Sequence, residues 1–460
     1  MNPFLNPIFL SKILKKYIFD IDRLKNLDED DLRKYQNKQF KKILQFAYTV
    51  PLYHEKYKKV GIYPGDIKGI QDIKKLPIIT KFDIKQYYPN GIISSKMRKD
   101  KLIKITTSGT TGKSLSIYSD FLDSINWLFE YIRVIKEYGI SWRKNKLTII
   151  GDFRPYTIGS RYISKELLSN LNHDFFFSNM QFLDTNEKSE KLIEDINRFN
   201  PEFIGGYIFR LSHLALLKEE GYGENINPKY IATIGYALTD YLRKLIEEVF
   251  GSHVFEVYGA TESGTIAFQC KNRNFHVMSD MVYLEFLKDN IPVKSKEPCE
   301  MIITKLYGLG TPIIRYNSVN DIVAPLYEKC SCGMSGDLIY KIYGRNDLSV
   351  YLPDGKLLLP SSITDIFGKV LYELRTRKIK DNMIIQHDLK KIEVQIVFDR
   401  EIRNDTTSVD EIFSVLRKGF QEKIGSEIDI IFKEVKKISS NRPRIISKLN
   451  KEKFEILQYV

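Results

Sequence analysis

Hydrophobic and polar residues follow two different periods along this chain, and the period changes from one segment to the next. In the middle of the chain, stretches with helical spacing alternate with short apolar runs: helices are predicted at 121–138, 185–198, 208–220 and 239–250, and strands at 146–151, 203–206, 230–236 and 253–259. Helices that alternate with buried strands are typical of an α/β fold with parallel strands. We therefore expect a parallel sheet flanked by helices in this region.

The two ends of the chain have other patterns. Residues 30–60 have the spacing of helices, with Pro and Gly in the connections. Beyond residue 275 the pattern becomes rich in strands, as at 281–287 and 299–306, and the last hundred or so residues mix strands and helices on a smaller scale, as at 391–399 and 408–425.

The simplest division is a large N-terminal domain at 1–345, which includes a helical lead at 1–90, and a small C-terminal domain at 346–460. The fold class we expect is α/β, with mixed sheets plus helices in the large domain. The small domain is expected to be α+β and to be joined by a hinge.

A cluster of small polar residues interrupts the pattern at 106–114, with the sequence TTSGTTGKS. Glycine lets backbone N–H groups approach an anion, while Ser, Thr and Lys add hydroxyl donors and a positive charge, so the cluster suits phosphate. It is not the P-loop of nucleotide triphosphatases, because only two residues separate Gly109 from the Gly112-Lys113 pair, where that motif needs four. Apolar runs at 101–105 and 115–119 predict a strand on each side. An ordinary turn between two strands is the alternative.

Composition narrows the class of protein. The chain has 460 residues, of which 43% are hydrophobic and 28% charged, as in an ordinary globular protein, and no apolar run approaches the roughly 18–20 residues that span a bilayer. We therefore expect a cytoplasmic protein. The formal charge of +13 is spread along the chain, without the concentrated basic stripe of a nucleic-acid footprint, so no nucleic-acid partner is expected.

The first twenty residues raise a separate question. Phe4, Leu5, Ile8, Phe9, Ile13 and Leu14 can share one helical face, with Lys12, Lys15 and Lys16 nearby. Such a helix resembles an interfacial segment, which makes residues 1–20 a candidate for peripheral membrane contact. The favoured interpretation is a helix that packs on the protein's own core, because apolar residues at helical spacing usually face a core.

Four motifs in register carry a resemblance to a known family. The Ser/Thr/Gly loop is followed by VFEVYGATESG at 254–264, TPIIRYNSVNDI at 311–322 and YGRND at 343–347. In this order and spacing the motifs resemble the adenylate-forming superfamily of acyl-CoA synthetases, and in particular the phenylacetate-CoA ligases and the CapK-like branch associated with capsular polysaccharide biosynthesis. The likeness extends to the helical lead at 40–84 and covers most of the chain from about residue 30.

The resemblance implies a reaction in two steps. A carboxylate attacks the α-phosphate of ATP to give an acyl-AMP and pyrophosphate, and AMP leaves when a thiol or an amine attacks. Matching the motifs residue by residue implies that Ser108, Gly109, Thr110, Thr111, Gly112 and Lys113 hold the β- and γ-phosphates. It further implies that Tyr258, Gly259 and Ala260 border the adenine, Thr261 bonds the α-phosphate and Glu262 helps to place Mg²⁺.

The remaining matched residues concern the ribose and the hinge. Asp321 is implied to take the ribose hydroxyls, since a carboxylate is a natural acceptor for a diol. Arg345 and Asp347 lie where the family has a ribose contact and its inter-domain hinge. The acyl carboxylate is expected beside Gly205, Gly206, Tyr207 and Tyr236.

Two departures from the family pattern bear on activity. Tyr236 stands where the family usually has a Glu, which affects the nucleotide or acyl pocket. The family's C-terminal Gly-Lys pair is absent: residues 438–444 read ISSNRPR. Arg442 or Arg444 is a candidate substitute, as are Lys437 and Lys448 nearby, although arginine and lysine are not interchangeable between two anions.

Three cysteines and a histidine form a candidate metal set. Cys270, His276, Cys330 and Cys332 offer three thiolates and one imidazole, which meets the tetrahedral requirement of structural zinc. Comparable patterns in the family strengthen this hypothesis, and the alternative is a set of reduced cysteines with a surface histidine. The fourth cysteine, Cys299, is expected to be a small core residue.

The sequence thus favours an ATP- and Mg²⁺-dependent ligase that passes an acyl group to coenzyme A, a carrier protein or an amine such as an amino sugar. It does not distinguish these acceptors or identify the acid. A different class remains open: a catalytically impaired nucleotide- or acyl-binding scaffold in a polysaccharide assembly at the membrane, which the missing lysine suggests.

Overall fold

The computed structural model describes residues 7–107, 114–157, 178–402, 404–439, 443–449 and 458–459. Its α-helices are α1 (Pro7–Asp20), α2 (Arg23–Asn26), α3 (Glu29–Ala47), α4 (Pro51–Lys59), α5 (Lys81–Tyr87), α6 (Phe121–Glu137), α9 (Ser189–Phe199), α10 (Ile208–Glu219), α11 (Asp240–Phe250), α12 (Pro360–Leu374) and α13 (Val409–Ile424).

The first strands are β1 (Ile103–Thr106), β2 (Ser116–Ser119), β3 (Leu147–Gly151), β4 (Met180–Asp184), β5 (Phe203–Tyr207), β6 (Tyr230–Ile234), β7 (His253–Ala260), β8 (Gly264–Gln269), β9 (Phe275–Val277), β10 (Val282–Lys288) and β11 (Ile291–Pro292). The later strands are β12 (Cys299–Lys305), β13 (Asp321–Leu326), β14 (Leu338–Arg345), β15 (Val350–Tyr351), β16 (Lys356–Leu358), β17 (Ile379–Asp388), β18 (Lys391–Phe398), β19 (Asp429–Glu434), β20 (Ile445–Ser447) and β21 (Gln458–Tyr459).

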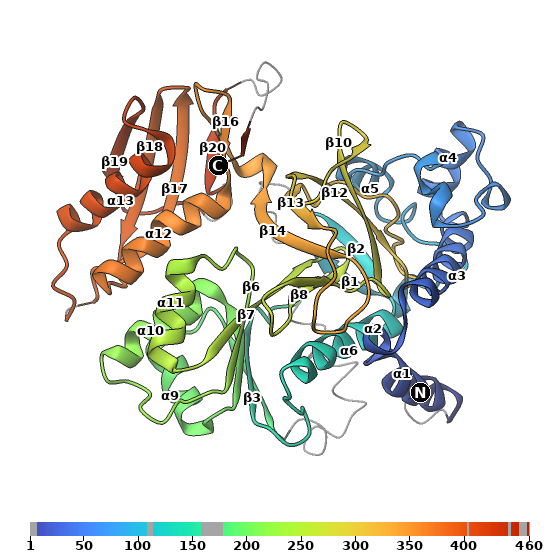
Figure 1. Ribbon diagram of the computed structural model, residues 1–460, viewed down its shortest axis with the longest axis horizontal. Helices are drawn as coiled ribbons and strands as arrows, with labels where there is room; N and C mark the ends of the chain where they lie inside the picture. The colour runs from blue at the N-terminus through green and yellow to red at the C-terminus, as the bar shows by residue number, and fades with distance from the viewer. Residues whose placement is uncertain are drawn as a thin grey trace.

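One large sheet is built from strands between residues 147 and 345 (Figure 1). Its order in the described residues is β11-β10-β12-β13-β14-β9-β8-β7-β6-β5-β3-β4. Strands β4, β3, β5, β6 and β7 are parallel to one another, and the pairs from β7 to β11 are antiparallel. The sheet is therefore mixed, as expected, and the predicted parallel strands are confirmed as β3, β5, β6 and β7.

Helices cover both faces of the parallel half. Apolar residues of α9, α10 and α11 pack on one face against Ile204, Ile231 and Val254. On the other face, α6 packs through Val134 and Ile135 against a cluster that includes residues of β3, β5 and β7. Burying apolar surface on both faces of a sheet is what holds parallel strands in place, and it accounts for their continuous apolar runs.

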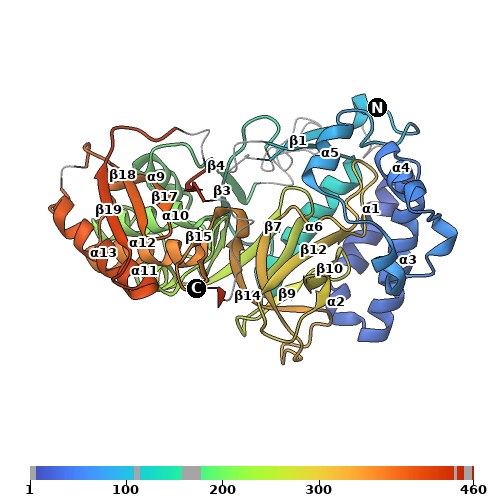
Figure 2. The same ribbon diagram turned by 90° about the horizontal axis from the view of Figure 1, so that it is seen from above.

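The N-terminal helices cover the antiparallel half of the sheet (Figure 2). Helix α1 packs Ile13 and Tyr17 beside α6, as the core interpretation predicts. Leu14, Ile18 and Phe19 are, in contrast, 51%, 62% and 65% exposed, so the expectation that Leu14 shares the buried face is wrong. The reason is geometric: successive helical residues are about 100° apart, and Ile13 occupies the position that faces α6.

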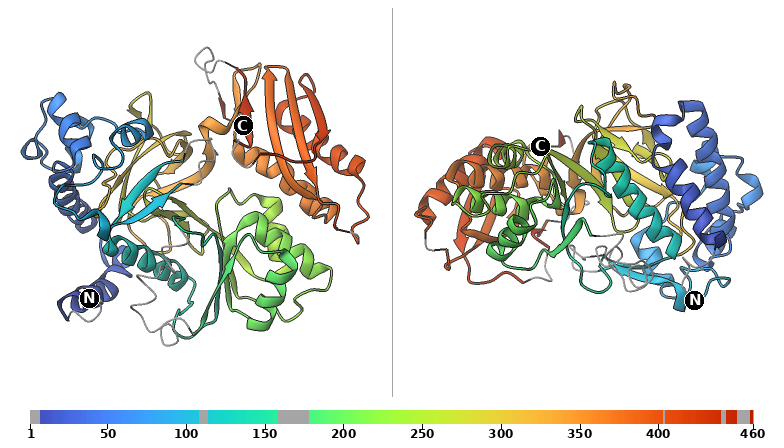
Figure 3. Two further views of the ribbon diagram at one scale, coloured as in Figure 1. Left: turned by 180° about the vertical axis from the view of Figure 1, so that it is seen from behind. Right: turned by 90° about the horizontal axis from the view of Figure 1, so that it is seen from below.

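The C-terminal region forms its own small α+β unit. Strands β19-β18-β17-β20 form a four-stranded sheet, and α12 and α13 cover one of its faces. Figure 3 shows this unit beside the α9–α11 layer, and α12 packs closely on α11 because Gly368 lets Leu242 and Thr239 approach its backbone. The boundary predicted at 345/346 coincides with the end of β14. None of the described helices is both long enough and apolar enough to span a membrane.

Candidate active site

The turn after β7 brings two pairs of buried polar side chains together. The Tyr258 hydroxyl donates a hydrogen bond to Asp321 Oδ2 at 2.6 Å, which joins β7 to the start of β13. The Tyr316 hydroxyl donates to Glu262 Oε1 at 3.2 Å. Two motifs separated by more than fifty residues in the sequence therefore meet at the end of the sheet.

Burial destabilises the charged forms of the two carboxyl groups at this site, Asp321 and Glu262. Burial raises the pKa of Asp321 to about 6, although the Tyr258 hydrogen bond and the charge of Arg345 act in the opposite direction. Burial likewise raises the pKa of Glu262, and Arg345, Tyr316 and Lys81 partly offset that effect. In buried carboxyl groups with raised pKa values, a nearby cation or hydrogen-bond donor has the largest stabilising effect on the charged form.

A cavity of about 240 Å³ opens beside these residues at the start of the C-terminal unit. Its lining consists of Glu300, Met301, Asn317, Asn320, Asp321, Ile322, Asn346, Asp347 and Tyr351. Arg345 Nε lies 3.8 Å from Asp347 Oδ1 and donates to the backbone carbonyl of Val319 at 3.4 Å. Asp321 and Asp347 thus lie in the wall of one cavity, and Arg345 is paired with Asp347.

A cation that the sequence patterns did not indicate, Lys81, lies close enough to interact with the charges of this site. Burial lowers the pKa of Lys81, the nearby charges of Lys85 and Arg345 add to that effect, and Glu262 and Asp347 oppose it. Lys81 is the first residue of α5, where Thr80 caps the helix and the Lys81 backbone N–H donates to Ser318 Oγ at 2.8 Å. The capping signature marks a helix start, but it says nothing about which distant motif that start approaches.

The predicted acyl side lies at the carboxyl ends of β5 and β6. Tyr236 is 49% exposed and packs edge-to-face on Phe209, with ring centroids 5.2 Å apart. Gly235 has φ +100°, and a Cβ there would meet the Tyr207 ring at 2.7 Å, so only glycine fits between these side chains. The pair Arg444–Asp381, 3.0 Å between Nη2 and Oδ2, lies close enough to influence the pKa of Tyr236.

The structure separates the candidate substitutes for the family lysine. Arg444 is the one that lies near Tyr236, whereas Lys437 is exposed and Lys448 Nζ contacts His387 Nδ1 at 3.0 Å. Arg442 lies outside the described residues, as do Ser108, Gly109, Thr110, Thr111, Gly112 and Lys113. The strands on either side of that loop are described: β1 and β2 pair antiparallel, and Thr107 bonds Leu115 through both backbone and side chain.

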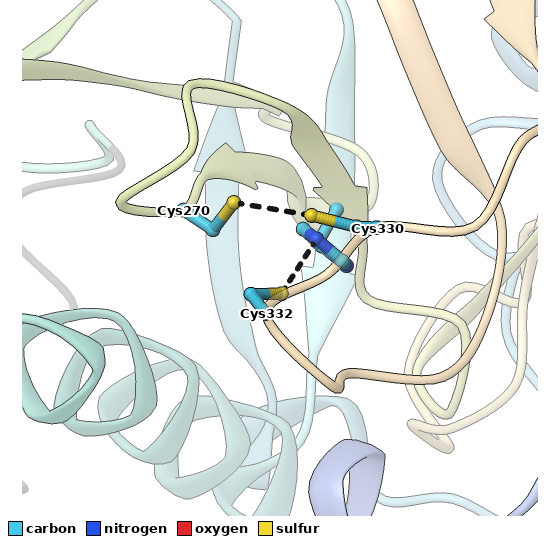
Figure 4. Close-up of side chains that lie close together, drawn as sticks. Cys270, Cys330 and Cys332 are labelled. Carbon is cyan, nitrogen blue, oxygen red and sulfur yellow. Dashed lines mark hydrogen bonds between the residues drawn. The ribbon is translucent and has the colours of Figure 1, made fainter.

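The four predicted zinc ligands come together (Figure 4). Their ligand atoms all lie within 4.8 Å of one another, with Cys270 Sγ 3.7 Å from Cys330 Sγ and Cys332 Sγ 3.1 Å from His276 Nε2. A tetrahedral zinc with Zn–S bonds of about 2.3 Å places its sulfurs about 3.8 Å apart, so the residues fit such an ion. Cys299 is buried in β12, outside the cluster, as predicted.

The chain is similar in sequence to known proteins over most of its length. No protein-family model matches the chain. The chain is 23% identical over 431 residues to phenylacetate-coenzyme A ligase of Escherichia coli (strain K12), a match that covers 89% of this chain and 93% of that protein. It is 24% identical over 433 residues to protein CapK of Staphylococcus aureus, covering 93% and 90%.

The solved structures include 2-hydroxyisobutyryl-CoA ligase in the postadenylation state in complex with 2-HIB-AMP, with a TM-score of 0.72, 16% identity, and coverage of 94% of this chain and 92% of that one. The chain therefore has the fold of the adenylate-forming ligases. In sequence it is similar to phenylacetate-CoA ligases and to CapK, which confirms the resemblance indicated by the four motifs.

Proposed function

We propose that the protein is an ATP- and Mg²⁺-dependent ligase that activates a carboxylic acid as an acyl-adenylate and transfers the acyl group to a thiol or an amine. The observation that carries this proposal is the pairing of Tyr258 with Asp321 and of Tyr316 with Glu262 at the end of the sheet, beside a cavity that Asp321 lines. Its agreement with the motif order of the relatives supports it.

The chemistry requires charge to be held in place while pyrophosphate leaves. Asp321 accepts from the ribose hydroxyls, and Tyr258, Gly259 and Ala260 border the base. Thr261 donates to the α-phosphate and residues 108–113 hold the β- and γ-phosphates. Mg²⁺, held by Glu262, supplies neutralisation of the charge that develops on the phosphates.

Lys81 and Arg345 add two fixed positive charges beside Glu262. Fixed cations act on the developing charge without having to reorganise during the reaction. In the second step the acceptor attacks the acyl carbonyl carbon and AMP leaves with the electron pair. The small unit that begins at residue 346 would turn about Asp347 between these steps, a movement of the kind that gates many enzymes.

The acceptor and the pathway are finer proposals. The similarity to phenylacetate-coenzyme A ligases favours coenzyme A, and the similarity to CapK favours a carrier or an amino sugar in surface polysaccharide biosynthesis. Contact with a membrane surface through residues 1–20 would suit the second case, because Leu14, Ile18 and Phe19 of α1 are exposed. The scaffold alternative is favoured by one observation, the arginines that stand where relatives have the Gly-Lys pair.

We also propose that Cys270, His276, Cys330 and Cys332 bind a structural zinc ion. The site has four protein ligands, which leaves no position for substrate, so its role is to connect strands rather than to react. It links the β8–β9 turn to the segment between β13 and β14.

Exchange of labelled pyrophosphate into ATP tests the ligase proposal, measured across a panel of aryl, fatty and amino acids. We expect exchange that depends on one class of acid and is lost in Lys113→Ala and Glu262→Ala. Lys101→Ala, a change at an exposed lysine before β1, is the matched control and should retain exchange. ATP binding without exchange for any acid would refute the proposal and favour the scaffold.

A further inference from the structure

Directly behind the Thr261–Glu262 turn lies a buried carboxylate that belongs to none of the four motifs. Glu130, on α6, is 1% exposed. Its Oε2 accepts the backbone N–H of Thr265 at 3.0 Å, and its Oε1 accepts the hydroxyl of Tyr307 at 2.6 Å. The Tyr307 oxygen is also 3.4 Å from the backbone carbonyl of Ser263. One side chain therefore holds the turn directly at Thr265 and indirectly at Ser263.

The backbone between Ser263 and Thr265 lies so close to α6 that a side chain at position 264 would clash with it. Gly264 has φ +83°, and a Cβ at this position would lie 2.9 Å from Trp127 Nε1 and 3.0 Å from Glu130 Oε2. Glu130 and Trp127 are one turn apart on α6, so the helix presents both to the same backbone segment. A turn that approaches a helix this closely needs glycine and a fixed helix position.

Burial raises the pKa of Glu130 to about 7, and the hydrogen bonds from Tyr307 and Thr265 and the charge of Lys305 act in the opposite direction. Lys305, at the end of β12, forms a buried ion pair with Asp123 of α6 at 2.6 Å, and its Nζ lies 4.4 Å from the Tyr307 ring centroid. Burying a carboxylate is costly unless hydrogen bonds and charges compensate it. The protein retains such a group here, with one oxygen on the Thr265 N–H and the other on the Tyr307 hydroxyl.

We propose that Glu130 is a positioning residue for adenylation: by holding Thr265 and, through Tyr307, Ser263, it fixes the directions of Thr261 and Glu262. This inference rests on the proposed function. Thr261 and Glu262 immediately precede the held segment, so a shift of its backbone would displace both side chains together. Because their task is to meet phosphate and Mg²⁺ at fixed distances, a displacement near 1 Å is enough to slow the reaction on the order of 100-fold.

The test compares Glu130→Gln, Glu130→Leu and Tyr307→Phe with the wild type in pyrophosphate exchange at varied Mg²⁺ concentrations. We expect Glu130→Leu to lower kcat about 100-fold and to raise the Mg²⁺ concentration for half-maximal rate, with KM for the acid unchanged. Glu130→Gln keeps one acceptor oxygen and should recover part of the loss, and Tyr307→Phe should have a smaller effect. Glu137→Gln, at the far end of α6 where Glu137 pairs with Lys25, is the matched control.

A second readout does not depend on activity: hydrogen exchange of the Thr265 amide should be faster in Glu130→Leu than in the wild type and in Glu137→Gln. A loss of rate with unchanged Mg²⁺ dependence would mean general destabilisation and would overturn the inference, as would unchanged exchange at Thr265. Wild-type protein without pyrophosphate exchange would overturn the ligase proposal and the adenylation role together, whereas active wild type with equally active Glu130→Leu would overturn this inference alone.

Discussion

Replacing Cys332 by Ser should release the zinc ion. The change removes one of four ligands whose atoms lie within 4.8 Å of one another and leaves Cys270, Cys330 and His276 in place. Serine is nearly isosteric with cysteine but a poor zinc ligand at neutral pH, because its hydroxyl does not ionise as a thiol does. The expected zinc content falls from one per chain to less than about one tenth.

The size of the effect on stability follows from the connections that the ion makes. Strand β9 pairs with β14 at two positions, Leu338–His276 and Ile339–Phe275, and the cluster adds a further link between the β8–β9 turn and the segment after β13. A ligand present at about 1,000 times its Kd stabilises the state that binds it by about 4 kcal/mol. We therefore expect the variant to lose about 4 kcal/mol of local stability in this region.

Elemental analysis and hydrogen exchange measure the two effects. Exchange should become faster at residues 270–277 and 328–337 and stay unchanged in the parallel strands. Cys299→Ser is the matched control, because Cys299 is buried in β12 where its Sγ lies 3.4 Å from the Val323 carbonyl, outside the cluster. Wild-type protein that contains no zinc after growth with zinc, or a Cys332→Ser variant that retains it, would refute the reasoning.

Three further predictions follow from the site. Burial raises the pKa of Asp321 to about 6, above its ordinary value near 3.9, so its contribution to folding stability falls as pH rises from about 4 to about 6. The charged carboxylate that accepts from the ribose forms only above about pH 6. Calorimetry should therefore show AMP binding about tenfold more weakly at pH 5 than at pH 7.5, and Asp321→Asn should remove this dependence on pH. Lys81→Met should slow pyrophosphate exchange about 100-fold, since it removes a fixed charge beside Glu262, and an unchanged rate would exclude Lys81 from the site. Arg377 forms two hydrogen bonds to Glu220, at 2.9 and 2.8 Å, which join the C-terminal unit to the end of α10. Arg377→Met removes this ion pair and should lower the free energy of unfolding by about 2 kcal/mol and increase the radius of gyration in small-angle scattering. An unchanged radius of gyration would contradict a role of Arg377 in docking the C-terminal unit.

Periodicity predicts the parallel half of the sheet well, because strands covered by helices on both faces must be continuously apolar. Strand β4 was not predicted: Met180–Asp184 is an edge strand whose residues are all only partly buried, so its composition carries no strong pattern. The cluster of Cys270, His276, Cys330 and Cys332 could be predicted because thiol and imidazole ligands identify themselves by type, even though Cys270 and Cys332 are sixty-two positions apart.

Lys81 and Glu130 illustrate what the sequence does not provide. Each interacts with the predicted site, but each belongs to a segment whose local pattern indicates only a helix. Their relation to the Thr261–Glu262 turn arises from tertiary packing, which brings α5 and α6 close to it. Local spacing cannot encode this relation, since each motif covers one continuous stretch of the chain.

The position of the ribose-binding candidate also connects nucleotide binding with the orientation of the C-terminal unit. Asp321 begins β13, while Asn346, Asp347 and Tyr351, which line the same cavity, follow the end of β14, at the start of the segment that leads into the small unit. A nucleotide seated on Asp321 would therefore contact residues on both sides of the expected hinge. Because a ligand shifts a conformational equilibrium only by its difference in affinity for the two states, contacts to Asp347 are the means by which ATP and AMP could favour different orientations.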